Sequence, residues 1–261
     1  MAILSERRGK IMCITINRPE VMNALDHEHI EELRKAFLDF RDDPELWVCI
    51  LTGAGDKAFC AGADMTKVIG RKISWPPDSK ADPDTTDLVS GYYELNIWKP
   101  MIAAINGFCL AGGLGIALVC DIRICSENAT FGTMGTSRGI LPGAGQTQTL
   151  PRVIPLAKAL ELFFTAERID AQEAYRWGLV NKVVPQAELM KAAWEMAEKI
   201  AKNAPLAVYA SKQACINGLD LSLREGIALE VNLREKLFST EDAAEGVAAF
   251  REKRQPNFKG R

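Results

Sequence analysis

Residues 106–115 read NGFCLAGGLG, and this glycine-rich stretch decides the fold that the sequence predicts. It follows an apolar run, Met101 to Asn106, that is typical of a buried strand, and it leads into a predicted helix. Small residues at the start of a helix leave its first backbone N–H groups uncovered. The stretch therefore predicts a strand, a tight turn and a helix whose first amides face whatever binds there.

A second stretch of the same kind lies earlier in the chain. Residues 60–64 read CAGAD, and they come after another strand-like apolar run, Trp47 to Thr52. Two backbone N–H groups that converge on one point form an oxyanion hole, which stabilises negative charge as it develops on a carbonyl oxygen. The pair of stretches therefore predicts a site for chemistry at a carbonyl group.

The remaining sequence predicts an α/β core followed by a helical extension. Strand-like and helical runs alternate in the first part of the chain, where one helix is predicted to begin at Leu25-Asp26. Residues 74–86 hold three prolines and predict a surface loop, and residues 87–98 predict a helix. Beyond residue 205 only helices are predicted. We therefore expect an α/β domain over residues 1–200 and a helical region over residues 201–261.

Composition excludes several classes of protein. The net charge of −2 gives no basic field for nucleic acid, and no apolar run approaches the roughly 20 residues that span a bilayer. The first ten residues lack the apolar core of a secretion signal. Seven cysteines without a C-x-x-C pair are typical of buried thiols in a reducing compartment. These features predict a cytoplasmic protein with no nucleic-acid or membrane partner.

Motifs of other enzyme classes occur but lack their required context. Residues 53–58, GAGDKA, resemble a dinucleotide fingerprint, but the chain that follows is not helical. Residues 135–139, GTSRG, match a nucleophile elbow, which needs a histidine later in the chain. The chain's histidines, His27 and His29, both precede it. They are two residues apart, point to different faces of a helix and cannot chelate one metal, so no metal site is predicted.

The chain resembles the crotonase family, the enoyl-CoA hydratase/isomerase superfamily, over essentially its whole length. The motifs that carry the resemblance are NRP at 17–19, NAL at 23–25, AFCAGAD at 58–64, the run from Lys99-Pro100 to Gly115, CDIR at 120–123, FG at 131–132, LPGAG at 141–145, GLV at 178–180 and EGVAAFREKR at 245–254. The resemblance implies repeated ββα units that form a core spiral. It also implies a C-terminal region that associates into a trimer or a dimer of trimers.

The resemblance further implies an acyl-CoA thioester as ligand, with coenzyme A as part of the substrate and no separate cofactor. It implies lyase or isomerase chemistry of the kind found in fatty acid metabolism. The N–H groups of Ala63 and Gly112 are expected to hold the thioester oxygen. The positions expected to contact coenzyme A are Ala24, Lys57, Ala61, Ala63 and Asp64, together with Phe250 and Lys253, which are expected to reach the coenzyme A of a neighbouring subunit.

The chain departs from the family at its acidic residues. Hydratases of the family use two glutamates to activate water and move a proton, and these positions are Gly115 and Gly135 here. A third acidic position used by some relatives is Gly143. Glycine cannot move a proton, so ordinary crotonyl-CoA hydration is disfavoured. Glycine also removes side-chain bulk, which predicts space for a bulky or branched acyl group.

Three alternatives follow from this departure. In the first, the site stabilises a thioester enolate and uses an external base such as bicarbonate, as in the dihydroxynaphthoyl-CoA synthases that residues 131–135, FGTMG, resemble. In the second, the chain supplies the acid or base itself, and the candidates are Asp87, Tyr92, Tyr93 and Glu94. In the third, the protein binds acyl-CoA without chemistry, as a carrier or regulator.

Overall fold

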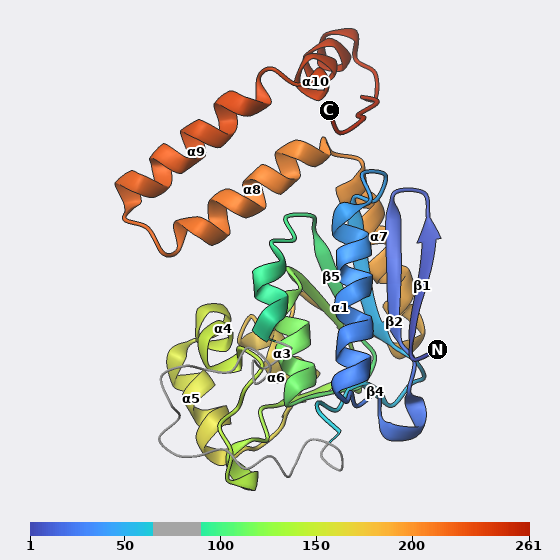
Figure 1. Ribbon diagram of the computed structural model, residues 1–261, viewed down its shortest axis with the longest axis vertical. Coiled ribbons are helices and arrows are strands. Elements are labelled where there is room, and N and C mark those ends of the chain that lie inside the picture. The colour runs from blue at the N-terminus through green and yellow to red at the C-terminus, as the bar shows by residue number, and fades with distance from the viewer. Residues whose placement is uncertain (65–89) are drawn as a thin grey trace.

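The computed structural model describes residues 1–64 and 90–261, in which two sheets form the core (Figure 1). The larger sheet has the order β1-β2-β3-β5-β7-β10, and the smaller one has the order β4-β6-β8-β9. The strands of the larger sheet are β1 (Ile3–Arg8), β2 (Ile11–Ile16), β3 (Val48–Gly53), β5 (Met101–Ile105), β7 (Ile122–Ser126) and β10 (Lys182–Val184). Those of the smaller sheet are β4 (Ala58–Cys60), β6 (Phe108–Leu110), β8 (Thr130–Gly132) and β9 (Ile169–Asp170).

The described ranges contain α-helices and short 3-10 helices. The α-helices are α1 (His27–Asp42), α3 (Gly112–Val119), α4 (Gln146–Val153), α5 (Leu156–Thr165), α6 (Ala171–Arg176), α7 (Leu189–Ala201), α8 (Pro205–Gly218), α9 (Leu223–Leu237) and α10 (Glu241–Glu252). Short 3-10 helices are η1 (Pro19–Val21), η3 (Ser90–Leu95), η4 (Thr136–Arg138) and η5 (Gln186–Glu188). Within the described ranges, no helix is long and apolar enough to cross a bilayer.

Successive strand pairs build both sheets at once. β3 and β4, β5 and β6, and β7 and β8 each place their first strand in the larger sheet and their second in the smaller one. Neighbouring first strands pair in parallel, and so do neighbouring second strands. The chain therefore advances by one repeat at a time in a spiral. This arrangement confirms the predicted α/β class with repeated units.

Both faces of the larger sheet are covered, which explains why its strands are almost continuously apolar. Alternate residues of one strand point to opposite faces. In β5, Ile102 and Ala104 pack in one buried cluster with α7, whereas Met101 and Ala103 belong to the cluster that contains Phe37 of α1. The core therefore lies on both sides of one sheet.

The start of α1 and the region before β5 show how far the helix predictions hold. α1 begins where predicted, with Asp26 as its N-cap accepting a hydrogen bond from the His29 N–H at 3.2 Å. In place of the helix predicted over residues 87–98, the described part of this stretch contains the 3-10 helix η3. Residues 87–89 of that prediction and the predicted loop 74–86 lie outside the described residues. The predicted helices after residue 205 are confirmed as α8, α9 and α10.

The C-terminal helices form an arm that extends from the core. α8 and α9 run side by side in opposite directions, away from the sheets, and α10 follows at the end of the molecule (Figure 1). α8 is tied to the core by an ion pair between Lys212 Nζ and Asp121 Oδ2 at 2.8 Å. α9 buries none of its residues within this chain. The domain boundary at residue 200 stays a prediction.

The C-terminal tail connects α10 back to the core. The Asp242 carboxylate is buried and accepts hydrogen bonds from the backbone N–H groups of Lys259, at 2.6 Å, and Gly260, at 2.8 Å. Gly260 lies against Pro205, and Phe258 packs on the buried cluster that contains Trp47. One carboxylate thus holds the tail in the position where it bridges the arm and the core.

We predict that Asp242→Ala lowers the free energy of unfolding by about 1.5–3 kcal/mol, because a hydrogen bond to a charged group contributes about that much. Urea denaturation measures this change, and hydrogen exchange should show faster exchange at the Lys259 and Gly260 amides. Asp220→Ala is the control, since its side chain is 80 % exposed and lies 3.9 Å from Arg152. Equal effects of the two substitutions would contradict the assigned role of Asp242.

We predict that the chain assembles into a trimer or a dimer of trimers. Its α9 leaves Leu223, Ile227 and Val231 exposed, and a patch of this kind is typical of an interface. Sedimentation at micromolar concentration should give a mass of three or six chains, and Ile227→Asp should shift it towards the monomer. Glu230→Gln, on the same helix, is the control. A monomeric wild-type protein would rule out this assembly.

Candidate active site

The two glycine-rich stretches meet in the structure. A methyl group built on Gly112 would lie 3.5 Å from Gly62 Cα and 3.6 Å from the Ala63 nitrogen, so the two backbones are neighbours. The Ala111 N–H donates to the Gly132 carbonyl at 2.8 Å, which ties the second stretch to β8. Residues that are about 50 positions apart in the sequence thus form one site.

This contact requires glycine at two positions. A methyl group on Gly107 would lie 2.1 Å from the Lys57 carbonyl oxygen, and one on Gly113 would lie 2.0 Å from the Cys60 carbonyl oxygen. No side chain fits at such distances from a backbone atom. The segments around β4 and β6 therefore pack backbone against backbone on both sides of the site.

The Ala63 amide points away from Leu25, its partner in a parallel bridge. The Leu25 N–H donates to the Gly62 carbonyl at 2.9 Å, and the Asp64 N–H donates to the Leu25 carbonyl at 2.8 Å. Successive amides of an extended chain point to opposite sides, so the N–H of Ala63 faces away from Leu25. Gly112 is the first residue of α3, and its N–H has no acceptor within the helix. Among the described residues, neither amide has a hydrogen-bond acceptor.

The backbone around these amides is strained. Ala111 has φ 48° and ψ −123°, a conformation that residues with a side chain rarely adopt. Such a residue costs about 1–3 kcal/mol, and strain of this kind concentrates at functional sites. Gly62, on the facing segment, has φ 100°. Both turns are thus held in unusual conformations on either side of the two free amides.

Two buried asparagines hold the loop that leads into the site. The Asn23 side chain donates to the carbonyl oxygens of Ala54, at 3.0 Å, and Ala58, at 2.7 Å. The Asn106 side chain donates to those of Gly55, at 2.8 Å, and Ala58, at 3.1 Å. Because both converge on the same carbonyl, the start of β4 is fixed relative to the end of β5.

Comparison with known proteins agrees with this geometry. A sequence model described as enoyl-CoA hydratase/isomerase matches residues 6–261. The chain belongs to the enoyl-CoA hydratase/isomerase family. It is 44 % identical to an (E)-benzylidenesuccinyl-CoA hydratase of Thauera aromatica over 260 residues, covering 100 % of both chains. It is 43 % identical to a short-chain-enoyl-CoA hydratase of Clostridium acetobutylicum, covering 99 % of this chain and 98 % of that one.

The fold of this family member is also shared by solved structures. The crystal structure of an enoyl-CoA hydratase from Bacillus anthracis aligns with a TM-score of 0.91 and 39 % sequence identity, covering 100 % of both chains. A similarity of this extent confirms the crotonase fold that the sequence motifs indicate.

The structure brings most of the predicted coenzyme A contacts of this family member together. Ala61 donates its N–H to the Met22 carbonyl at 3.0 Å, and Asp64 donates to Leu25, so both lie beside the segment that contains Ala24. Lys57 is exposed at the start of β4, and Ala63 closes the same segment. These residues line one edge of the site.

Phe250 and Lys253 do not join that group within one chain. They lie at the end of α10, at the opposite end of the molecule from β4 (Figure 1). Phe250 is 85 % exposed. Contact with coenzyme A at the β4 segment of the same chain is therefore absent, and the expected contact with a neighbouring subunit stays a prediction.

The space expected beside Gly115 and Gly135 is absent. A methyl group on Gly115 would lie 2.5 Å from the Ala144 Cβ, and one on Gly135 would lie 2.9 Å from the Ile140 carbonyl oxygen. The loop between η4 and α4 therefore occupies the volume in which the first carbon of a side chain would stand. The expectation that these glycines leave room for a larger acyl group is wrong for this conformation of the chain.

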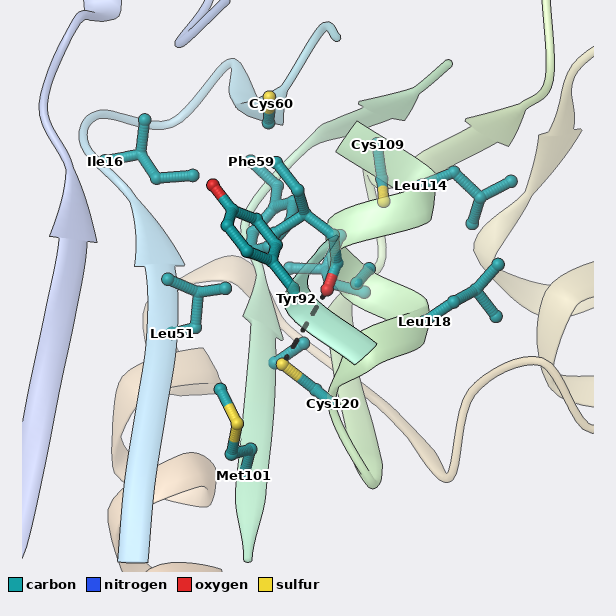
Figure 2. Close-up of a cluster of buried hydrophobic side chains, with 14 of the residues drawn as sticks. Ile16, Leu51, Phe59, Cys60, Tyr92, Met101, Cys109, Leu114, Leu118 and Cys120 are labelled. Carbon is teal, nitrogen blue, oxygen red and sulfur yellow. Dashed lines mark hydrogen bonds between the residues drawn. The ribbon is translucent and has the colours of Figure 1, made fainter. Parts of the chain in front are cut away.

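The four candidate acid or base residues differ in where the structure places them. Tyr92 is a core residue: its hydroxyl donates to the Ile30 carbonyl at 2.8 Å, and its ring meets Phe37 edge-on. Figure 2 shows Tyr92 within the buried cluster. Glu94 is exposed, and Asp87 lies outside the described residues. Tyr93 is the candidate that the structure places beside the loop of Ala144.

Tyr93 lies directly over Gly145, the residue after Ala144. A methyl group on Gly145 would lie 2.7 Å from the Tyr93 Cε2. Burial of the hydroxyl raises the pKa of Tyr93 to about 12, and a hydrogen bond with the Thr149 side chain partly offsets this rise. Tyr93 is therefore a protonated phenol at neutral pH.

Sequence patterns missed two features of this site. Ala144 fills the space at Gly115, and the Cys60 thiol accepts the Gly62 N–H at 3.4 Å, which helps to hold the turn before Ala63. Neither residue type signals a role in chemistry. Only the placement of cysteine two positions before a glycine, as in other side-chain-to-backbone turns, could have indicated the second contact.

We predict that Gly112→Ala folds but loses about 10²–10³-fold in kcat on whatever acyl-CoA the enzyme converts, because the methyl group would keep the thioester oxygen from the Ala63 N–H and the loss of one oxyanion-hole donor usually costs that much. The added methyl group would lie 3.5 Å or more from every neighbouring atom, which is an ordinary contact distance, so the chain should still fold. One of these neighbours is the Ala63 nitrogen, at 3.6 Å, so the methyl group would stand beside that amide. Steady-state kinetics and circular dichroism measure the two effects.

Two further substitutions are controls for Gly112→Ala. Gly218→Ala is the control for activity, because nothing lies within 4 Å of the added methyl group. Gly113→Ala should fail to fold, because its methyl group would overlap the Cys60 carbonyl oxygen. A fully active Gly112→Ala protein would contradict the proposed position of the thioester.

Proposed function

We propose that this protein binds an acyl-CoA thioester and stabilises its enolate between the backbone amides of Ala63 and Gly112. The observation that carries the proposal is the proximity of two backbone amides that have no acceptor among the described residues. An enolate places its negative charge on the thioester oxygen, and two preorganised donors lower the energy of that charge. Family membership supports an acyl-CoA substrate.

The position of Gly112 strengthens one of these donors. It opens α3, whose dipole places partial positive charge at that end of the helix. α3 is entirely buried from Gly113 to Leu118, so the dipole acts in a medium that screens charge weakly. The site therefore favours an anion at the Gly112 amide without using a charged side chain.

We propose addition or elimination of water as the outcome of this enolate chemistry. Relatives are named as an (E)-benzylidenesuccinyl-CoA hydratase, a short-chain-enoyl-CoA hydratase and a carnitinyl-CoA dehydratase, which support that reaction class. The proton transfers do not follow the two-glutamate scheme, because Gly115 and Gly135 stand at those positions and the loop beside them leaves no space for a longer side chain. Coenzyme A enters as part of the substrate, and no separate cofactor is required.

Two other possibilities are resolved by experiment. An external base such as bicarbonate would replace the missing carboxylates, and a protein that only binds acyl-CoA would need no base. Under each of these possibilities, we expect oligomer formation to complete the coenzyme A site, because Phe250 and Lys253 are far from the β4 segment of their own chain (Figure 1).

We predict that the protein exchanges the α-hydrogens of butyryl-CoA for deuterium in D₂O but hydrates crotonyl-CoA more slowly than about 1 per second, the lower end of typical enzyme turnover. Exchange requires only enolate formation and reprotonation, so it does not depend on the identity of the natural acyl group. Mass spectrometry measures the exchange, and the loss of absorbance of the conjugated thioester measures hydration.

The controls separate the alternatives. Exchange that rises in proportion to added bicarbonate would show an external base. Binding of butyryl-CoA without exchange, with or without bicarbonate, would contradict the proposed function and favour a carrier. Rapid crotonyl-CoA hydration by the wild-type protein would contradict the assignment of the glutamate positions. Gly115→Glu with Gly135→Glu should not restore hydration, because both side chains would overlap the loop of Ile140 and Ala144.

A further inference from the structure

We propose that Arg18 is a positioning residue of the oxyanion hole, whose guanidinium acts on the Ala63 N–H through two peptide groups. This inference rests on the proposed function, since it requires a thioester oxygen at the amides of Ala63 and Gly112. It assigns a role to the arginine of the NRP motif, which the proposed function leaves without one.

The two amides of the site differ in what orients them. The Gly112 N–H belongs to the same peptide group as the Ala111 carbonyl, which accepts a hydrogen bond from the Leu114 N–H at 3.0 Å. Because Leu114 lies in α3, the Gly112 amide is oriented by its own helix. Ala63 instead forms an isolated parallel bridge with Leu25. The direction of its amide therefore depends on a separate segment of the chain.

One hydrogen bond sets the direction of the Ala63 amide. The Gly62 carbonyl and the Ala63 N–H belong to one planar trans peptide group, in which the C=O and N–H bonds point in opposite directions. The Leu25 N–H donates to the Gly62 carbonyl at 2.9 Å. Leu25 therefore holds the carbonyl on one side of the segment and aims the Ala63 N–H towards the other side.

Arg18 holds the peptide group that makes this contact. The Ala24 carbonyl and the Leu25 N–H are again the two ends of one peptide group. The Arg18 Nη1 donates to the Ala24 carbonyl at 2.5 Å, and a charged donor of this kind forms the stronger class of hydrogen bond. A continuous series of hydrogen bonds thus runs from the guanidinium, through the 24–25 and 62–63 peptide groups, to the Ala63 N–H.

A positive charge at the start of this series strengthens the donor at its end. Each hydrogen bond polarises the peptide group that accepts it, and the N–H of that group then becomes a better donor to the next carbonyl. In the described part of the chain, Arg18 forms no ion pair with a carboxylate. Its charge therefore favours a developing negative charge on the thioester oxygen without contact between the two.

The turn that carries Arg18 is itself fixed in the core. The Arg18 N–H donates to the Asn23 Oδ1 at 2.9 Å, and the Arg18 carbonyl accepts the Asn23 N–H at 2.9 Å. Asn23 is completely buried, and its Nδ2 donates to the Ala58 carbonyl at 2.7 Å. The backbone of Arg18 is thus tied to the start of β4, the strand that leads to Ala63.

The first test measures the hydrogen bonds to the thioester oxygen directly. Infrared difference spectroscopy on the whole protein records the carbonyl stretching band of bound butyryl-CoA that carries ¹³C at the thioester carbon. A stronger hydrogen bond to the oxygen lowers the frequency of this band. In the wild-type protein it should lie below the band of free butyryl-CoA, and Arg18→Met should move it part of the way back. Arg18→Lys keeps a cation and should stay nearer to the wild-type position.

The same variants are then compared in the exchange of butyryl-CoA α-hydrogens in D₂O. Arg18→Met should slow the exchange by about 10-fold, a part of the roughly 10²–10³-fold that the loss of a whole oxyanion donor costs, while the dissociation constant for butyryl-CoA stays unchanged. Arg41→Met is the matched control. The Arg41 guanidinium also donates to a backbone carbonyl, that of Leu95 at 3.1 Å, but it lies at the opposite end of α1 from Leu25.

A backbone substitution tests the series of hydrogen bonds itself. Replacing Leu25 by the corresponding α-hydroxy acid turns its N–H into an ester oxygen and leaves every side chain in place. The carbonyl band should then move back towards the free position, as in Arg18→Met. Adding Arg18→Met to the ester should cause no further movement, because both changes break the same series. The ester variant decides the question even if circular dichroism shows that Arg18→Met folds poorly.

The outcomes separate this inference from the proposed function. If the wild-type protein exchanges and shows the lowered band, and Arg18→Met or the Leu25 ester keeps both, Arg18 does not act through Ala63 and the proposed function stands. A raised dissociation constant in Arg18→Met with an unchanged band would also overturn the inference, because Arg18 would then bind coenzyme A. If the wild-type protein binds butyryl-CoA with neither a lowered band nor exchange, both proposals fail. A band that moves back in both variants but not in Arg41→Met supports the assignment.

Discussion

The contact between two backbone segments, around β4 and around β6, is the constraint on which the site depends. Gly107 and Gly113 allow the two main chains to touch at distances that exclude any side chain. The side chains of Asn23 and Asn106 hold the Ala58 carbonyl, so the approach is also fixed in direction. Because buried amide groups must find partners, this network also satisfies polar atoms that the close approach removes from water.

The proposed division of labour follows from this constraint. The proposed oxyanion donors are main-chain groups, so they depend on the fold and not on the identity of a side chain. An acid or base, in contrast, is usually a side chain, which can differ between proteins of one fold without changing the sheets. Gly115 allows Ala144 and its loop to close against α3, and the ring of Tyr93 on η3 lies against Gly145 of that loop.

The arm has a different physical basis from the core. The larger sheet is covered on both faces within the chain, whereas α9 buries none of its residues. Polar anchors help to hold the arm, namely Lys212 on Asp121 and the tail on Asp242, together with Phe258, which packs on the buried cluster that contains Trp47. Its apolar residues are free for association, which agrees with the predicted oligomer.

The sequence by itself determined the α/β class, α1, the main strands, the C-terminal helices and the positions of the two glycine-rich stretches, because these depend on local periodicity, caps and glycine content. The three-residue strands of the smaller sheet are too short to carry a periodic signal. Tertiary structure alone decided which tyrosine donates its hydroxyl to Ile30 in the core and which packs on Gly145, since Tyr92 and Tyr93 are adjacent and chemically identical. It also decided that Ala144 fills the space at Gly115, because contacts between distant segments leave no pattern in either one.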